Sequence, residues 1–359
     1  MIDLSRRDLL GRIGFGAGLY AAIAMAPRSL LGDLLFEPTA PLVEPKPIPP
    51  NPFVNGARSL VAVVQGRDPH AMLAAGLERL GGLIRLPIQG KHVLIKPNVV
   101  NDRPPPSTTN PLVVEAVIRS VRSAGAGEVA VADSSGLIRF PTRANLEATG
   151  MRAAAARQGA KILALEDEGW VGVEPPGATV LRRYYVSKPL YDADLVINVP
   201  VVKTHRFAHY SCSLKNWVGI VHPRNRPSVA FLSGHWHERI AELNLAVHPQ
   251  LTVADGTTIM IEGGPTSGTP AQADLLLISG DRVALDVMAL ALLRSYGQWP
   301  KILEGSPWDQ RQIKRAIELG LGASGPDHIE LVPVSTEGES AAFARLVDRL
   351  RKDIGAWQV

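Results

Sequence analysis

The chain has a single cysteine, Cys212, among its 359 residues. One thiol excludes an intramolecular disulfide, and it also excludes an iron–sulfur cluster or a zinc site built from the chain's own cysteines. A lone cysteine is more often a small buried hydrophobic residue than a nucleophile, although a thiolate reaction at Cys212 is the alternative. We therefore expect the hydrophobic core to stabilise the fold.

Aromatic residues are also scarce, at 5% of the chain. The net charge of +4 is mildly basic, but lysine and arginine are scattered along the sequence and are not interleaved with aromatic residues. Proteins that bind nucleic acids usually concentrate these residues in patches. The composition therefore argues against a nucleic-acid partner.

Three common motifs are missing as well. The sequence contains no Gly-x-Ser-x-Gly elbow, no Walker loop, and no Gly-x-Gly-x-x-Gly that joins a strand to a helix. These absences remove the usual sequence signals of serine hydrolases, of ATP and GTP binding, and of dinucleotide binding.

Residues 1–26 are typical of an export signal. Arg6 and Arg7 follow Ser5, Leu9 stands two residues after the pair, and residues 13–26 are moderately apolar and rich in glycine. This pattern predicts a twin-arginine signal, with the export machinery as a partner and a periplasmic or extracytoplasmic location. The apolar run is short for a membrane span. The alternative is an amphipathic helix with two solvated arginines.

Removal of the signal has two candidate sites in the sequence. Small residues end at Ala26, where Pro27 would hinder a peptidase, and also at Ala24. An uncleaved signal would tether the protein to the membrane, which is the one membrane contact that we expect. Residues 27–58 follow, and residues 37–53 contain seven prolines. They predict an extended spacer before a single domain at residues 59–359.

From residue 59 onward, short β-rich runs alternate with helical stretches, which predicts an α/β fold with a mostly parallel sheet layered between helices. The expected strands are residues 59–65, 92–98, 128–133, 161–165, 194–200, 251–256, 274–279 and 328–334. The expected helices are residues 69–81, 111–124, 142–158, 235–247, 282–296, 309–319 and 339–353. Two of the helices have clear starts, at Asn110 before Pro111 and at Asp281.

Four of the expected strands end in polar residues. They are followed or closed by Lys96 and Asn98, by Asp133 and Ser134, by Asn198 and Lys203, and by Asp255. Ligands bind at the carboxyl ends of strands in open parallel sheets, so we expect one shared site at this edge. The alternative is that these residues only make turns where strands stop.

The sequence resembles domain of unknown function family 362, a family of bacterial and archaeal proteins, over residues 61–297. The matching stretches are Ile95 to Asn98, Gly125 and Ala126, Asp133 and Ser134, Asp194 to Pro200, Lys203 to His205, Leu214 to Asn216 with Gly219, His235 or His237, Asp255 and Gly256, Glu262 to Pro265, and Asp286. The resemblance implies a shared fold and site but no general reaction. Many relatives add a ferredoxin-like module with clustered cysteines, which this chain lacks.

The resemblance favours a functional role for Lys203, His205, Lys215 and Asn216, which we predict to be catalytic. Lysines supply ammonium donors, and histidines carry protons or bind metals near neutral pH. If residues 208–220 form a helix, Lys215 and Gly219 share one of its faces. The alternative is a basic loop, and for His209 that interpretation is preferred.

His205, His235, His237 and Asp255 are the predicted ligands of a divalent metal. On a strand, both histidines of a His-x-His pair face one side and can bind one metal, whereas on a helix they point apart. The pair is therefore a weak metal site by itself, and metal binding would need His205 and Asp255 as further ligands. Residues 255–270 read as a loop whose glycines allow a ligand to approach the backbone. Turn chemistry is the alternative there.

Within this loop, Glu262 is the predicted acid or base. The predicted substrate-binding residues are Lys96, Asn98, Asp133, Ser134, Gly263 and Gly264.

Three functions agree with these features. The first is an exported, metal-assisted enzyme that acts on a small anionic molecule. The second is a periplasmic protein that binds an anion or a metal without a reaction, and for this lysines alone would suffice. The third is an accessory protein for cofactor assembly, which a hydrophobic docking face after residue 298 would support.

Overall fold

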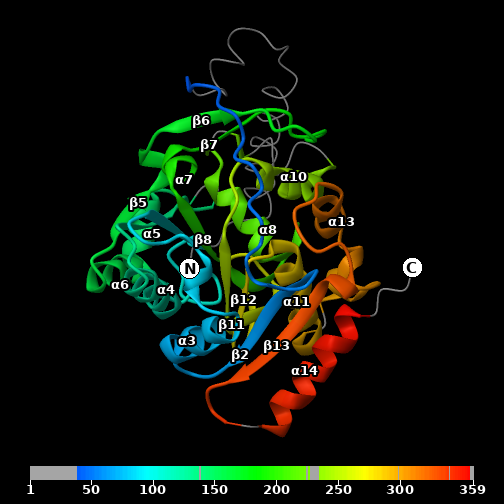
Figure 1. Ribbon diagram of the computed structural model, residues 1–359. Coiled ribbons are helices and arrows are strands. Elements are labelled where there is room, and N and C mark those ends of the chain that lie inside the picture. Colours follow the sequence, from blue (N-terminus) through cyan, green and yellow to red (C-terminus); the bar gives the residue numbers. More distant parts are fainter. Residues whose placement is uncertain are drawn as a thin grey trace, which may run out of the picture.

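The computed structural model describes residues 39–136, 139–223, 225–226, 234–297, 299–338 and 340–355. The predicted signal at residues 1–26 and the start of the predicted spacer lie outside these ranges. Within them, a large mixed sheet forms the centre of the molecule and helices cover both of its faces (Figure 1). The predicted α/β fold is confirmed.

The central sheet has eleven strands among the described residues. Eight of them follow the order β1-β2-β12-β11-β8-β3-β4-β5, while β13 pairs with β2, β9 pairs with β11, and β10 pairs with β9. The strands are β1 Val54–Asn55, β2 Arg58–Gln65, β3 His92–Pro97, β4 Glu128–Asp133, β5 Lys161–Ala164, β8 Leu195–Val199, β9 Val201–His205, β10 His209–Ser211, β11 Leu251–Gly263, β12 Gly268–Ser279 and β13 Ile329–Ser335. Strands β11, β8, β3, β4 and β5 run parallel, whereas β12 is antiparallel to both of its neighbours.

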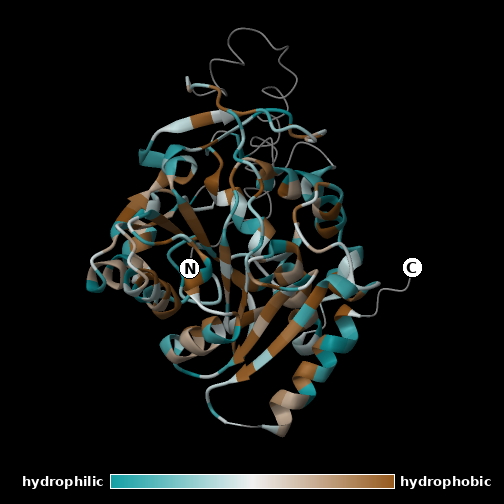
Figure 2. Ribbon diagram, in the orientation of Figure 1, coloured by the Kyte–Doolittle hydropathy of each residue, from teal (hydrophilic) through white to brown (hydrophobic). Residues whose placement is uncertain are grey.

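Alternate residues of the central strands enter two separate cores. Val61 and Val63 of β2 pack on one face of the sheet, and Ala62 and Val64 pack on the other. This alternation follows from the two-residue period of a strand, and it lets helices bury both faces. Hydrophobic colour accordingly concentrates on the central strands (Figure 2).

One core lies under α3, α4, α5 and α6, and the other lies under α8, α10, α11, α13 and α14. The helices are α3 Pro69–Arg79, α4 Pro111–Ser123, α5 Thr142–Ala148, α6 Met151–Arg157, α7 Lys188–Asp192, α8 Ser213–Asn216, α10 Trp236–Glu242, α11 Arg282–Tyr296, α12 Pro300–Leu303, α13 Arg311–Glu318 and α14 Ala341–Ile354. A small second sheet pairs β6 Trp170–Val173 with β7 Tyr184–Ser187. None of the described helices combines the length and the apolar character that a membrane span requires.

The predicted helix starts are confirmed. The side chain of Asn110 accepts a hydrogen bond from Leu112 N at 3.0 Å, and Asp281 accepts from Val283 N and Ala284 N at 2.9 Å each. These bonds satisfy backbone N–H groups that have no partner within the first helical turn. The predicted helix over residues 142–158 is instead two helices, because Gly150 adopts a left-handed backbone (φ 77°) between α5 and α6.

Two segments differ more strongly from the prediction. Residues 208–220 do not form one helix, because β10 precedes the short helix α8 and the 3₁₀ turn Trp217–Ile220. Residues 255–270 are not a loop, since β11 continues to Gly263 and forms a hairpin with β12. Only the tip of this hairpin, at residues 264–267, is a turn.

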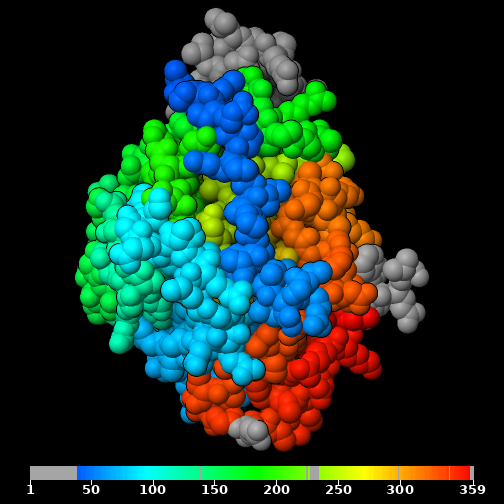
Figure 3. Space-filling view, viewed as in Figure 1, coloured from blue at the N-terminus to red at the C-terminus, as the bar shows by residue number. Residues whose placement is uncertain are grey.

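The described part of the predicted spacer lies across the surface of the domain (Figure 3). Val43 N donates to Gly172 O at 2.9 Å, and Tyr191 Oη donates to Glu44 O at 2.8 Å. At the other end of the chain, β13 pairs with β2 along seven residues and α14 packs on α11. Buried residues after 298, such as Trp308, Ile313 and Leu350, thus contribute to the hydrophobic core.

Candidate functional site

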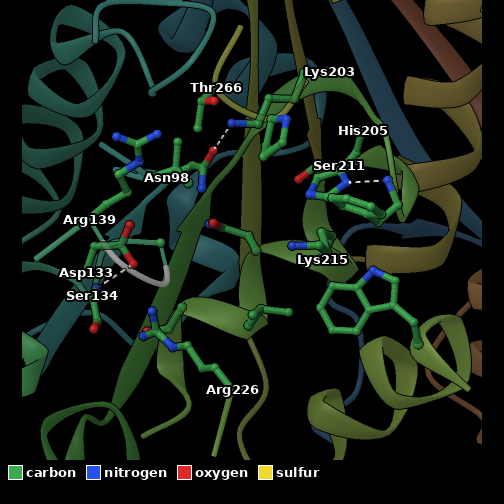
Figure 4. Close-up of a pocket in the computed structure, with 18 residues that line it drawn as sticks. Asn98, Asp133, Ser134, Arg139, Lys203, His205, Ser211, Lys215, Arg226 and Thr266 are labelled. Atoms are coloured by element: carbon green, nitrogen blue, oxygen red, sulfur yellow. Dashed lines mark hydrogen bonds between the residues drawn. The ribbon is translucent and has the colours of Figure 1, made fainter. Parts of the chain in front are cut away.

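A cavity of about 360 Å³ opens where β3, β4 and β9 end, as predicted for the shared site (Figure 4). Its size is suited to a small molecule. Its polar and charged walls are Asn98, Asp133, Ser134, Arg139, Lys203, His205, Ser211, Lys215, Asn216, Arg226 and Thr266. Val100, Phe207, Val218, Trp236 and Pro265 add apolar surface, and Gly136 and Gly219 complete the lining.

Beneath the cavity, Lys96 and Asp133 form a buried ion pair at 2.6 Å. Asp133 also accepts hydrogen bonds from Val99 N at 2.6 Å and from Ser134 N at 2.8 Å, so its negative charge is already satisfied. Burial lowers the pKa of Lys96, although the charge of Asp133 opposes this. Lys96 was predicted to bind substrate, but it does not line the cavity and supports Asp133 from below.

Lys203 lies on β9 and is almost wholly buried. Its Nζ donates to Asn98 Oδ1 at 2.5 Å and to Ser107 O at 2.6 Å. Burial, followed by the charge of Lys215, lowers the pKa of Lys203 to about 7. The two acceptor oxygens hold the amine in place and favour its charged form.

Lys215 lies on α8, on the opposite side of the cavity from Asp133. Its Nζ stands 5.1 Å from the ring centroid of Trp236, a distance that permits a cation–π contact. Among the described residues, no salt bridge or hydrogen bond engages this amine. Burial, followed by the charges of Arg226 and Lys96, lowers the pKa of Lys215 to about 7.

Asn216 links the strands beneath the cavity to α8. Its Nδ2 donates to Asn198 Oδ1 at 2.7 Å, and Asn198 Nδ2 donates to Ser213 Oγ at 3.1 Å. Asn216 Oδ1 accepts a hydrogen bond from Lys96 Nζ at 3.3 Å. These contacts place Asn216 on the wall of the cavity but use its polar atoms for structure.

Asp286 on α11 holds the start of α8. Its carboxylate accepts from Ser213 N at 2.6 Å, from Leu214 N at 3.2 Å and from Tyr210 Oη at 3.1 Å. Burial raises the pKa of Asp286 to about 7. The family resemblance includes Asp286, but the sequence did not indicate that it positions the helix of Lys215.

Arg226 is a further cation of the cavity that the sequence did not reveal, since it lies in no motif. Its guanidinium donates to three backbone oxygens, Val221 O at 3.0 Å, Gly219 O at 3.1 Å and Ser135 O. These acceptors carry no net charge. Burial lowers the pKa of Arg226 to about 10, so the side chain stays charged at neutral pH.

The predicted metal ligands do not fit a metal site. The described residues contain no group of three His, Cys, Asp or Glu side chains that could hold an ion. His205 lines the cavity, but its Nδ1 accepts from Phe207 N and Ala208 N at 3.1 Å each. Asp255 accepts from Asn110 N at 2.7 Å and from Thr257 Oγ1 at 2.7 Å, so it serves the turn before α4.

The two remaining predicted ligands diverge. His235 precedes α10 and is exposed, with Nδ1 3.9 Å from a Glu238 oxygen. His237 is buried against His209, and their ring centroids are 4.5 Å apart. Residues 236–242 are helical, and side chains two residues apart on a helix lie on different faces, so His235 and His237 point apart. No step of a reaction is therefore assigned to a metal.

The predicted site residues of the β11–β12 hairpin, Glu262, Gly263 and Gly264, do not line the cavity. Glu262, the predicted acid or base, is exposed and lies outside the cavity lining. Its carboxylate accepts a hydrogen bond from Thr269 Oγ1 at 3.2 Å. Gly263 and Gly264 have positive φ values of 87° and 77°, and a Cβ on Gly264 would stand 2.0 Å from Thr204 O. The two glycines therefore allow the turn to pack closely, and it is the next residues, Pro265 and Thr266, that reach the cavity.

Cys212 and His209 lie away from the cavity lining. Cys212 is buried, and burial raises the pKa of its thiol well above the usual value, which opposes a thiolate. His209 bonds the side chain of Gln310 at 3.0 Å. Of the predicted site residues, the structure brings Asn98, Asp133, Ser134, Lys203, His205, Lys215 and Asn216 to one cavity.

Comparison with known proteins supports the family resemblance. Residues 93–291 match the family model described as Domain of unknown function (DUF362). The chain is also 30% identical over 237 residues to the thylakoid-associated protein sll1697 of Synechocystis sp.. This aligned region covers 62% of this chain and 70% of that protein. A solved structure, the lactate racemase apoprotein from Thermoanaerobacterium thermosaccharolyticum, aligns with 84% of this chain and 90% of its own at a TM-score of 0.41 and 9% identity. With the family model matching more than half of its length, the chain belongs to the DUF362 family.

Proposed function

We propose that the cavity binds a small anionic molecule and that the protein is an enzyme that acts on it. One observation carries the proposal: Lys203, Lys215 and Arg226 line a cavity in which the one acidic side chain among the described walls, Asp133, is already paired with Lys96. Among the described residues, no second carboxylate lines the cavity to match these buried cations. Burying such charges is costly, and an anionic ligand would offset that cost.

The lowered pKa values of Lys203 and Lys215 support an enzyme over a protein that only binds, because these amines can transfer protons at neutral pH. Cations that stay charged at neutral pH, as Arg226 does, suffice for binding, whereas Lys203 and Lys215 have pKa values lowered to about 7. Groups that titrate near the working pH are the efficient general acids and bases. Perturbed pKa values of this kind cluster at functional sites.

Isothermal titration calorimetry of the purified chain tests anion binding. Phosphate, acetate and lactate serve as probes at neutral pH, because they differ in charge and shape but share anionic oxygens. We expect at least one to bind, and Lys203→Met and Lys215→Met to weaken that binding about 10- to 100-fold, the strength of a hydrogen bond to a charged group.

Lys352→Met is the matched control, since Lys352 is exposed on α14 and away from the cavity. Binding that is equally strong in all three variants would place the anion elsewhere and contradict the proposal. Saturable binding without any turnover of bound compounds would favour the binding protein instead.

We also propose that the chain is exported, on the support of Arg6, Arg7 and the apolar run after them. A fusion of the N-terminal residues to a reporter that works only outside the cytoplasm tests this. Replacing Arg6 and Arg7 by lysine is expected to abolish export, because the twin-arginine route reads the arginine pair. A reporter signal that survives the double replacement would contradict this route.

A further inference from the structure

The amines of Lys203 and Lys215 enter the cavity with different surroundings. Lys203 Nζ donates to Asn98 Oδ1 and Ser107 O, whereas Lys215 Nζ engages none of the described side chains through a hydrogen bond or salt bridge. Both amines point to the side of the cavity where Asn98 and Arg139 lie (Figure 4). Acceptor oxygens stabilise an ammonium, so Lys203 keeps its proton more readily than Lys215.

The charges around Lys215 push it further toward the neutral amine. Arg226 and Lys96 both oppose its protonation, and no carboxylate among the described residues pairs with it. For Lys203, the charges of Lys215 and Lys96 also oppose the proton, but Asp133 and Asp255 favour it. The two acceptor oxygens at 2.5 and 2.6 Å hold an ammonium at Lys203, and Lys215 has no such acceptor among the described residues, so these contacts favour the proton on Lys203 when the two lysines share one.

A neutral lysine amine next to a second cation, against an apolar wall, is the arrangement of a lysine that attacks carbonyl groups. The wall here is Trp236 with Val218. Resting on the proposed function, we propose that Lys215 forms an imine with the carbonyl group of a small 2-oxo acid, whose carboxylate is held by Lys203 and the positive charge of Arg226.

The step balances without an oxidant or a metal. Lys215 Nζ adds its electron pair to the carbonyl carbon, the carbon–oxygen double bond becomes a single bond, and one proton passes from this nitrogen to the oxygen, which gives a neutral carbinolamine with a hydroxyl group. Lys203 donates its proton to this hydroxyl, which leaves as water while the carbon–nitrogen double bond forms. The product is an iminium on Lys215 with a neutral Lys203, and the charge of the pair is conserved.

Reductive trapping tests the proposal on the full chain. Sodium borohydride converts an imine to a stable secondary amine, so incubation with pyruvate, glyoxylate, 2-oxobutyrate or 2-oxoglutarate and then borohydride is followed by intact mass and peptide mapping. We expect about one adduct per chain with at least one of the four, on Lys215, as a single activated lysine predicts. Lactate, which has the carboxylate but no carbonyl, is expected to slow the labelling and to form no adduct.

Lys215→Arg keeps the charge but removes the amine that forms the imine, so the adduct should be lost. Lys203→Arg should slow labelling by about 100-fold, the lower range for loss of a general acid. Lys352→Arg, on α14, should label as the wild type does. Circular dichroism checks that each variant is folded, and the mapped adduct of the wild type does not depend on any variant.

The outcomes separate the two proposals. If carboxylates bind in the calorimeter but none of the four 2-oxo acids labels Lys215, the imine is wrong and the anion site stands. If neither binding nor labelling occurs, both proposals fail. Labelling spread over surface lysines and unchanged in Lys215→Arg also overturns the imine.

Discussion

Lys96 Nζ lies 2.6 Å from Asp133 Oδ1, and both side chains are buried, with Asp133 in the wall of the cavity and Lys96 outside its lining. The pair joins the ends of β3 and β4, so Lys96 shares the negative charge of Asp133 with the cations of the cavity. Removing one partner of a buried pair exposes the other to an apolar interior without compensation.

Asp133→Asn should therefore lower the free energy of unfolding by about 3–5 kcal/mol, measured by urea denaturation. The double variant Lys96→Met with Asp133→Asn should recover part of that loss, because it removes both charges and leaves an amide oxygen that accepts from the backbone. The exposed pair of Lys161 and Glu128 supplies the control, and Lys161→Met should change stability little. An equal effect at both pairs would mean that burial does not set the cost.

Anion affinity should fall as the pH rises through 7. Lys203 and Lys215 have pKa values lowered to about 7, so both are mostly protonated below that pH and mostly neutral well above it. An anion binds the protonated forms better, and the affinity measured by calorimetry should drop by about 10- to 100-fold from about pH 6 to about pH 9. In Lys215→Met the drop should be smaller, and an affinity that rises with pH would contradict the assignment.

Gly219→Ala should disturb the buried pair without changing any charge. A Cβ at this position would stand 2.6 Å from Asp133 Oδ1 and 2.8 Å from Lys96 Nζ. Overpacking of this kind costs about 1–3 kcal/mol of unfolding free energy, which thermal or urea denaturation measures. Gly169→Ala is the control, since its Cβ would meet only Lys188 at 3.4 Å. Equal stability of both variants would show that the pair shifts at no cost.

Asp286→Asn should weaken anion binding from a distance. The amide cannot accept from Ser213 N, Leu214 N and Tyr210 Oη together, because one oxygen becomes an N–H donor. We expect α8 to shift, the free energy of unfolding to fall by about 1–3 kcal/mol, and the calorimetric affinity for the anion to fall with it. Asp327→Asn, at an exposed position, is the control. Unchanged affinity in a destabilised Asp286→Asn would show that Lys215 does not depend on this cap.

The sequence predicted the parts of the fold that depend on local patterns. Strand β2 was predictable because Leu60 to Val64 are apolar throughout and fill both faces of a sheet. The starts of α4 and α11 were predictable because Asn110 and Asp281 cap the residues that directly follow them. The carboxyl edge was predictable because parallel strands end together.

The rest depends on contacts between distant residues. The sequence predicted Asp255 to be a metal ligand, but its carboxylate accepts a hydrogen bond from Asn110 N, 145 positions earlier in the chain. No local pattern marks this contact. The strand β10 is only three residues long and begins at His209, a non-glycine residue with φ 66°, so no periodic pattern marks it. In the hairpin, Gly256 and the glycines near 264 suggested a loop, although Thr257 to Ile261 are good strand formers.

Arg226 gives the cavity a positive charge that persists at a pH where Lys203 and Lys215 are neutral. Its guanidinium donates to three carbonyl oxygens among the described residues, and its pKa of about 10 lies well above those of the two lysines. Alkaline solution therefore neutralises both lysines while the positive charge of Arg226 persists. An occupant drawn in by charge would be loosened at high pH but still held, so proton uptake and retention of the occupant are served by different side chains.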